Sequence, residues 1–110
     1  MGNRIQEEQQ AKEQMLISRI RYPNREELEM FAIATQLMGT DQVKAKCEDG
    51  TERQCRIPGK MKKKVWIRQG DLLIIRLWSF QPIKADIVWR FLGTQAEHIK
   101  RKGLLKNLPI

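Results

Sequence analysis

The clearest alternation of apolar and polar residues runs through positions 43–47, which read Val-Lys-Ala-Lys-Cys. A period of two is typical of a strand with one face in a core and the other in solvent. Asp49 and Gly50 follow and indicate a hairpin turn, and a second alternating segment leads from there to Ile57. The pattern therefore predicts an antiparallel pair of half-buried strands.

The length of the hairpin loop decides which side chains share a face. A two-residue turn at Asp49 and Gly50 would put Cys55 on the face opposite Cys47, because a one-residue slip reverses every side chain. A three-residue loop, 48–50, with Gly50 left-handed in a bulge, restores one apolar face, and a five-residue loop has the same parity. Cys55 then lies opposite Val43, too far from Cys47 for a disulfide. In this register the core is lined by Val43, Ala45, Cys47, Cys55 and Ile57. Arg53 falls on the same face, which suits a charged residue poorly.

Three further strands are expected on either side of this hairpin. The first contains Phe31, Ile33 and Leu37 and ends at Gly39, and the fourth spans 72–78 and is apolar on both faces for part of its length. The fifth runs over 84–91. Its apolar side is predicted to hold Ala85, Ile87, Trp89 and Phe91. Trp78 and Trp89 stand at alternating positions of apolar strands, so both are predicted to be core residues.

A helix is expected after the fifth strand. Thr94 is its predicted N-cap, with Glu97 three residues later as the partner in a capping box. Cations at 100–102 fall in the last turn, where the helix dipole favours them, and Gly103 ends the helix.

Five short strands with a basic connector between the third and fourth predict an OB-type barrel in an all-β dominated fold. The length of 110 residues suits one core. We expect three parts: a flexible N-terminal tail over 1–25, an OB-fold RNA-binding domain over 26–93, and a C-terminal helix and tail over 94–110 that pack on the barrel.

The charge of the chain lies in the folded body. The formal net charge is +8, and residues 1–29 hold five Lys or Arg against six Asp or Glu. The remaining residues therefore carry +9, which favours a polyanionic partner.

The most concentrated cations lie in the run 59–67, which reads Gly-Lys-Met-Lys-Lys-Lys-Val-Trp-Ile. Such a run is often a solvated connector. Here it is bordered by strands, other cations are predicted nearby at Lys44, Lys46, Arg56 and Arg68, and an indole lies within it. Lysines neutralise phosphates and an indole stacks on a base, so we interpret the run as part of a nucleic-acid site. For Trp66, packing in the core and stacking on a base both remain open.

Other functions have little support in the sequence. His98 is the only histidine, and it forms no paired-ligand spacing with Cys47 or Cys55 for zinc. We therefore expect no enzyme, no metal and no cofactor. No apolar run approaches the ~20 residues that cross a bilayer, and the N-terminus is too polar for a signal peptide. We expect a soluble, cytoplasmic monomer with two free thiols and no membrane partner.

The sequence resembles a known family, translation initiation factor 1A, and it resembles the archaeal branch of that family more than the eukaryotic one. The resemblance runs in order, with matching spacing, from about Arg19 to about Gly103. It is carried by the segments 36–39, 45–50, 53–60, 63–67 and 84–88.

The resemblance implies an S1-like OB barrel without catalytic activity that binds the small ribosomal subunit at the aminoacyl (decoding) site through ribosomal RNA. It also implies a role in initiator-tRNA recruitment and start-codon selection, beside other initiation factors. The family pattern places Lys60, Lys63, Lys64 and Trp66 against RNA. With the cations around them, the expected RNA-binding residues are Lys44, Lys46, Arg56, Lys60, Lys62, Lys63, Lys64, Trp66 and Lys84.

Two departures from the eukaryotic pattern stand out. Eukaryotic members carry a long acidic C-terminal tail and a basic N-terminal one, whereas this sequence ends in Leu-Pro-Ile after Lys106 and begins with a Gln/Glu-rich segment. We therefore do not carry over to this chain the contacts that such tails make.

The main alternative is a general single-stranded RNA-binding OB protein, such as an RNA chaperone. That class displays several aromatic residues on its binding strands, whereas aromatics are 6% of this chain and most are predicted to be buried. A protein-interaction module would not account for the net positive charge of the folded body. Attachment to acidic lipid would need an amphipathic basic helix, which the pattern does not show.

Overall fold

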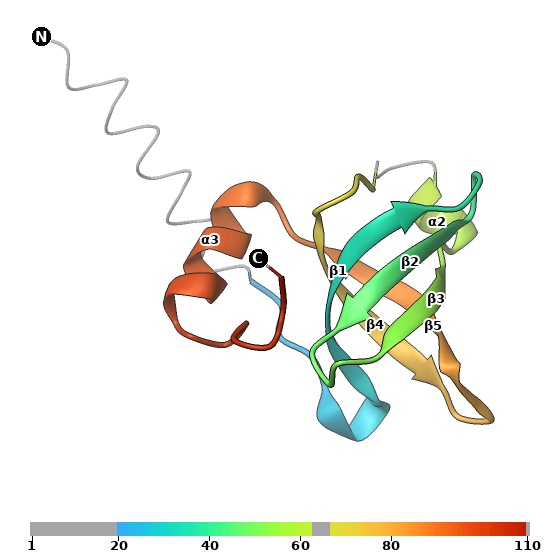
Figure 1. The fold of residues 1–110 in the computed structure, drawn as a ribbon, viewed down its shortest axis with the longest axis horizontal. Coiled ribbons are helices and arrows are strands. Elements are labelled where there is room, and N and C mark those ends of the chain that lie inside the picture. The colour runs from blue at the N-terminus through green and yellow to red at the C-terminus, as the bar shows by residue number, and fades with distance from the viewer. Residues whose placement is uncertain (1–19, 63–66, 110) are drawn as a thin grey trace, which may run out of the picture.

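Five strands close into a barrel in the order β1–β2–β3–β5–β4 (Figure 1). The computed structural model describes residues 20–62 and 67–109, so the predictions for residues 1–19 and for Lys63, Lys64 and Trp66 lie outside the described residues. The strands are β1 (Glu29–Leu37), β2 (Gln42–Cys47), β3 (Glu52–Arg56), β4 (Leu72–Trp78) and β5 (Gln81–Arg90). This architecture confirms the predicted OB-type barrel.

Short helices flank the barrel. A 3₁₀-helix, η1 (Arg25–Glu27), precedes β1, α2 (Gly59–Lys62) lies between β3 and β4, and α3 (Gly93–Arg101) follows β5. The sequence analysis predicted α3 and missed η1 and α2, both too short to show a helical period. No helix among the described residues is long and apolar enough to span a bilayer.

The β2–β3 hairpin has the predicted register. Val43 lies opposite Cys55, the loop is 48–50, and Gly50 has φ +88°. Arg53 does face inward, and its guanidinium is satisfied at the barrel end: Nη1 and Nη2 donate to the Asp49 carboxylate at 2.9 and 2.8 Å, and Nε donates to the Pro82 carbonyl at 2.6 Å. These bonds explain how a charged residue fits on the apolar face.

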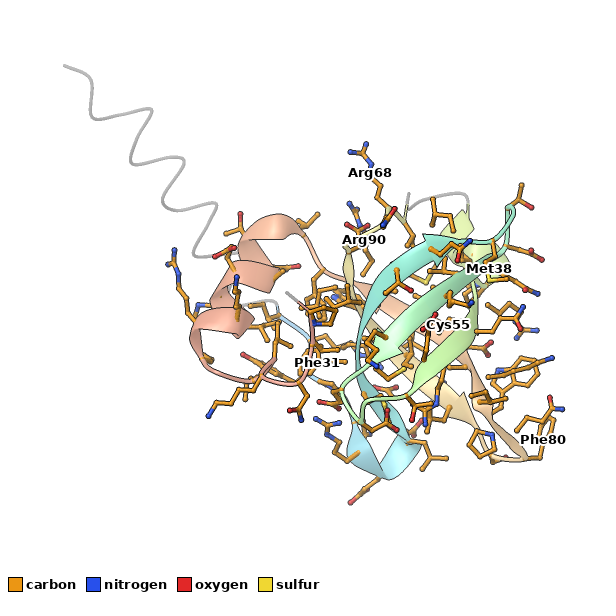
Figure 2. All side chains as sticks on the ribbon, viewed as in Figure 1. Phe31, Met38, Cys55, Arg68, Phe80 and Arg90 are labelled. Atoms are coloured by element: carbon orange, nitrogen blue, oxygen red, sulfur yellow. The ribbon has the colours of Figure 1, made fainter. Side chains whose placement is uncertain are left out.

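Two apolar clusters stabilise the fold. One fills the barrel and includes Val43, Cys55, Leu73 and Ile87, which are fully buried. The other lies outside the barrel, where α3 and the segment after it cover β1, β4 and the end of β5 (Figure 1). It consists of Phe31, Ile33, Leu72, Ile74, Phe91, Ile99, Leu105 and Leu108. Figure 2 shows Phe31 between the barrel and α3.

Trp89 departs from the prediction. The side chain of Trp89 is 36% exposed, so its assignment to the core was wrong. The register of β5 against β4 shifts between the pairs Ile75–Ile87 and Ile74–Trp89, which is an irregularity of the β-bulge type. One extra residue reverses the inward and outward positions that follow it, and Trp89 leaves the row of Ala85 and Ile87.

The start of α3 also departs from the prediction, whereas its end does not. The helix begins at Gly93 with Leu92 as N-cap, and the Leu92 N–H donates to Gln95 Oε1 at 3.0 Å. The predicted capping box of Thr94 and Glu97 was therefore wrong, because Gln95 supplies the bond two residues earlier. Gly103 has φ +75° and its N–H donates to the Lys100 carbonyl at 3.0 Å, as expected of a glycine that ends a helix.

A buried carboxylate ties the chain before β1 to the barrel. The Glu29 side chain, 1% exposed, accepts bonds from Arg21 Nη2 at 2.9 Å, Arg76 Nη2 at 2.7 Å and the Asn24 N–H at 3.0 Å. Burial acts to raise the pKa of Glu29, but these donors and the two guanidinium charges outweigh it and lower the pKa. Arg21 and Asn24 belong to the predicted tail, so part of that segment contacts the body. The boundaries proposed for the three parts stay predictions.

Candidate nucleic-acid interface

The outer face of β2, β3 and β5 carries the polar half of the alternating pattern. Lys44 lies opposite Gln54, which lies opposite Lys84, so the three side chains form one row across three strands. The next row runs from Gln42 to Arg56 to Asp86. Neither α3 nor the segment after it covers this face (Figure 1). It is the part of an OB barrel on which oligonucleotides commonly bind.

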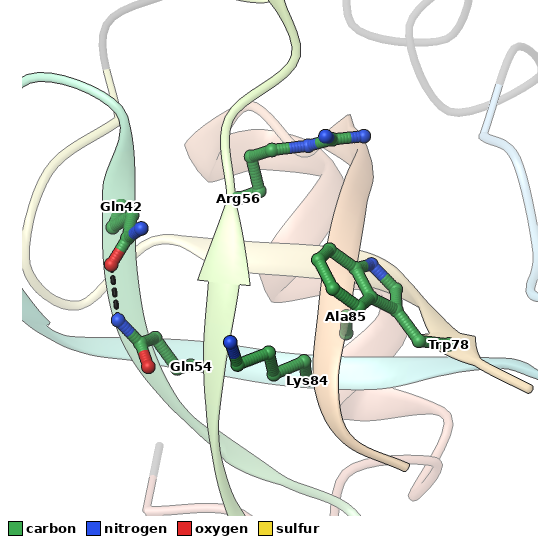
Figure 3. A pocket seen from close by; sticks show the side chains of 6 residues that line it. All are labelled: Gln42, Gln54, Arg56, Trp78, Lys84 and Ala85. Atoms are coloured by element: carbon green, nitrogen blue, oxygen red, sulfur yellow. Dashed lines mark hydrogen bonds between the residues drawn. The ribbon is translucent and has the colours of Figure 1, made fainter. Parts of the chain in front are cut away.

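Trp78 stands at the edge of this face with two cations around its ring. The Arg56 Cζ and the Lys84 Nζ each lie 5.6 Å from the indole centroid, within the range of cation–π attraction. These three residues line a shallow pocket with Gln42, Gln54 and Ala85 (Figure 3). Trp78 is half-buried and lies at the surface, so its assignment to the core was wrong.

Asp86 holds this arrangement in place. Its Oδ1 accepts from Trp78 Nε1 at 3.1 Å and from Arg56 Nε at 3.1 Å, and its Oδ2 accepts from Arg56 Nη2 at 3.2 Å. A carboxylate that bonds both the indole and the guanidinium restricts their rotamers, so less entropy is lost when a ligand binds. Gln54 Nε2 donates to Gln42 Oε1 beside them, as the dashed line in Figure 3 shows.

The structure brings most of the described candidate cations to this face. Lys44 and Lys46 lie on β2, Arg56 at the end of β3, and Lys84 on β5. Lys44 pairs with Glu52 at 3.7 Å and Arg56 with Asp86, whereas Lys46 and Lys84 make no ion pair within residues 20–62 and 67–109.

Lys60 and Lys62 lie on α2, which follows β3 at one end of the barrel. Met61 packs against the barrel core, and its N–H donates to the Pro58 carbonyl at 2.9 Å. Lys60 is exposed and forms no ion pair with another described residue. The Lys62 side chain, like Lys63, Lys64 and Trp66, lies outside what the structure describes. Their part in RNA binding stays a prediction, as does that of the whole residue set.

The sequence analysis missed Phe80 and Ile83 beside this face. Phe80 is 79% exposed, and its ring centroid lies 6.0 Å from that of Trp78. Figure 2 shows Phe80 at the tip of the turn between β4 and β5. One signal was available: Phe80 falls in a two-residue turn, where a large side chain has little to pack against, but that turn was not assigned.

Cys47 and Cys55 are buried free thiols that form no disulfide with each other. Burial raises the pKa of the Cys55 thiol to about 12, with the neighbouring Cys47 acting in the same direction. A thiol that stays protonated at neutral pH is a poor nucleophile and a poor metal ligand. The two residues therefore act as small core side chains.

Comparison with known proteins identifies the family of this chain. The family model for "Translation initiation factor 1A / IF-1" matches residues 17–109. The chain belongs to this family. It is 51% identical over 90 residues to translation initiation factor 1A of Archaeoglobus fulgidus, which covers 82% of the chain and 93% of that protein. It is 43% identical over 105 residues to translation initiation factor 1A of Methanopyrus kandleri, and the match covers 96% of the chain and 86% of that protein.

These matches confirm the resemblance stated above and support a role in translation initiation. Among solved structures, YjeQ from Thermotoga maritima superimposes with a TM-score of 0.50 at 18% identity, covering 59% of this chain and 23% of that one. At that identity the likeness shows the fold alone. Membership of the initiation factor 1A family supports a role in translation initiation, and the outer face of β2, β3 and β5 is where RNA binding can be tested.

Proposed function

We propose that this initiation factor binds the small ribosomal subunit at the aminoacyl (decoding) site through ribosomal RNA and supports initiator-tRNA recruitment and start-codon selection. The observation that carries the proposal is the cationic outer face of β2, β3 and β5 in a member of the initiation factor 1A family. We further propose that the factor acts in the cytoplasm as a monomer, beside other initiation factors and the initiator tRNA, without catalysing a reaction.

The mechanism is electrostatic positioning. Lys46 and Lys84 extend from the barrel and Lys60 from α2, all without described acidic partners, so each can neutralise a phosphate. Such contacts orient a protein on RNA and carry little sequence information, so the folded shape of the decoding site provides the specificity. Each neutralised phosphate contributes roughly 0.7–0.9 to the slope of log K against log salt. We expect subunit binding to weaken steeply with salt, and a flat response would contradict the mechanism.

Chemical footprinting of small-subunit RNA with and without the protein tests the location. Protection confined to the decoding site is the expected result, and protection elsewhere or nowhere would overturn the proposal. Lys63→Glu with Lys64→Glu should abolish the protection. Lys100→Glu with Lys102→Glu, at the end of α3, makes the same charge change on exposed residues away from the face and should retain it.

General single-stranded RNA binding remains the second candidate, and one observation favours it. Proteins of that class display aromatic residues where they bind RNA, and here Trp78 is half-buried at the edge of the candidate face and Phe80 beside it is 79% exposed. Tight binding to unstructured RNA that grows with RNA length, together with no protection of small subunits, would favour this function over the first.

A further inference from the structure

The turn between β4 and β5 presents apolar side chains to solvent. Trp78 pairs with Gln81 across the turn, which leaves Ser79 and Phe80 at its tip. Phe80 is 79% and Ile83 56% exposed, so neither gains much stability from burial in the free protein. Single exposed apolar residues are common, but here two lie on the hairpin that also carries the half-buried Trp78.

The surroundings of this hairpin are cationic. The Phe80 ring lies 6.0 Å from the Trp78 ring, and Arg56 and Lys84 lie 5.6 Å from the same indole. Asp86 is the carboxylate among them, and it is already engaged by the indole and by Arg56. The group therefore combines an open aromatic ring with more positive than negative charge.

We propose that this hairpin is a base-stacking platform: Phe80 takes an unpaired nucleobase of RNA, and Arg56 and Lys84 hold the phosphate of that nucleotide. The proposal rests on the proposed RNA-binding function and deepens it. The Trp78 ring centroid lies 6.0 Å from that of Phe80 and 5.6 Å from Arg56 Cζ and from Lys84 Nζ, so a nucleotide whose base stacks on Phe80 can place its phosphate toward the cations. The tilt of 39° between the two rings leaves no parallel slot, so the base stacks on Phe80 alone.

Charge favours a nucleotide over an apolar protein partner at this position. A protein helix or strand that covered Phe80 and Ile83 would also desolvate Arg56 and Lys84, which costs free energy unless that partner brings carboxylates. A nucleotide supplies both parts, since its base covers the ring and its phosphate meets the cations.

Binding of single-stranded RNA oligonucleotides in the absence of ribosomes tests the platform. We expect the wild type to bind octa-adenylate more tightly than octa-uridylate at low salt, because purines stack more strongly. Phe80→Ser should weaken octa-adenylate binding by about 5- to 150-fold, the range for loss of one stacked base. It should leave the salt slope unchanged, because stacking releases no counterions.

Three variants sharpen the test. Phe80→Tyr keeps the ring and should bind like the wild type. Leu104→Ser, at a residue 45% exposed in the segment after α3, makes a similar loss of apolar surface away from the hairpin and should have no effect. Lys84→Gln should reduce the salt slope while keeping the preference for adenine.

The outcomes separate this proposal from the function on which it rests. Unchanged oligonucleotide binding by Phe80→Ser, or no adenine preference in the wild type, overturns the platform. Loss of subunit binding by Phe80→Ser with normal oligonucleotide binding also overturns it, because the hairpin then contacts protein. Failure of the wild type to protect small-subunit RNA overturns the proposed function, and the oligonucleotide experiment still decides the platform.

Discussion

Two outer faces of the same barrel differ in what covers them. On β1 and β4, four consecutive positions are buried, because the barrel fills one side and α3 with its following segment covers the other. On β2 and β3, buried and accessible positions alternate, because only the barrel interior covers them. The covered face is apolar and stabilises the fold, whereas the uncovered face is cationic and available to a ligand.

The comparison shows how function can be separated from stability within one small sheet. A change on the covered face should lower the free energy of unfolding, and a change on the uncovered face should alter binding. Removing a similar side chain from each region tests this distinction most directly.

Phe91→Ala should give the largest change in stability. Phe91 is 2% exposed and its ring lies 5.9 Å from that of Phe31 beneath α3. We expect a loss of about 3–5 kcal/mol in the free energy of unfolding, measured by urea denaturation, because a cavity replaces the ring. Phe80→Ala is the matched control on the exposed hairpin and should change stability by less than about 0.5 kcal/mol. Equal effects would mean that the two faces are not distinct.

Glu29→Gln should have an intermediate effect. It removes the charge that Arg21 and Arg76 share, and we expect a loss of about 1–3 kcal/mol at neutral pH, the scale of hydrogen bonds to charged groups. Glu52→Gln, which removes an exposed pair with Lys44 at 3.7 Å, should cost less than about 1 kcal/mol.

The pH dependence provides a second readout for Glu29. Because its pKa is lowered in the folded state, the stabilisation is fully present above the unfolded value of about 4.3 and is lost as pH falls through the folded value. Wild-type stability should therefore decline more steeply than that of Glu29→Gln below about pH 5. Parallel acid profiles of the two proteins would show that this carboxylate is not held as described.

Among the three test variants, Leu28→Gly should have the smallest effect, and it should be stabilising. Leu28 has φ +61°, in the left-handed region that costs an L-residue about 1–2 kcal/mol, and its side chain is 47% exposed. Glycine loses about 0.5–1 kcal/mol in entropy on folding, so the net gain should be at most about 1 kcal/mol. Leu104→Gly is a control at similar exposure without positive φ, and it should not raise the denaturation midpoint.

The sequence predicted the parts of the structure in which local pattern and tertiary packing agree. Residues 43–47 alternate because one side faces the barrel, and parity selected an odd loop around Asp49, which fixes the pairing of Val43 with Cys55. The bounds of β4 were predicted because an apolar run of that length is typical of a strand buried on both faces.

The two tryptophan errors have different causes. The irregularity near Trp89 has no signature in the alternation, so a residue predicted to be inside lies outside. Trp78 was a different error: Ile75 and Leu77 pack in the barrel core, so simple alternation already places Trp78 on the outer face, beside Arg56 and Lys84. The candidate site was thus predicted for its cations, which follow simple alternation, and missed for its aromatic rings.

Small-subunit binding by two charge-reversed proteins over a salt titration tests the central claim, that the uncovered face binds RNA. Lys46→Glu with Lys84→Glu changes this face, and Lys100→Glu with Lys102→Glu changes the end of α3 by the same net charge. We predict that the first pair weakens binding strongly and lowers the magnitude of the salt slope by roughly 1.4–1.8, because two phosphate contacts are lost. The second pair should leave the slope unchanged, and equal losses from both pairs would contradict the account.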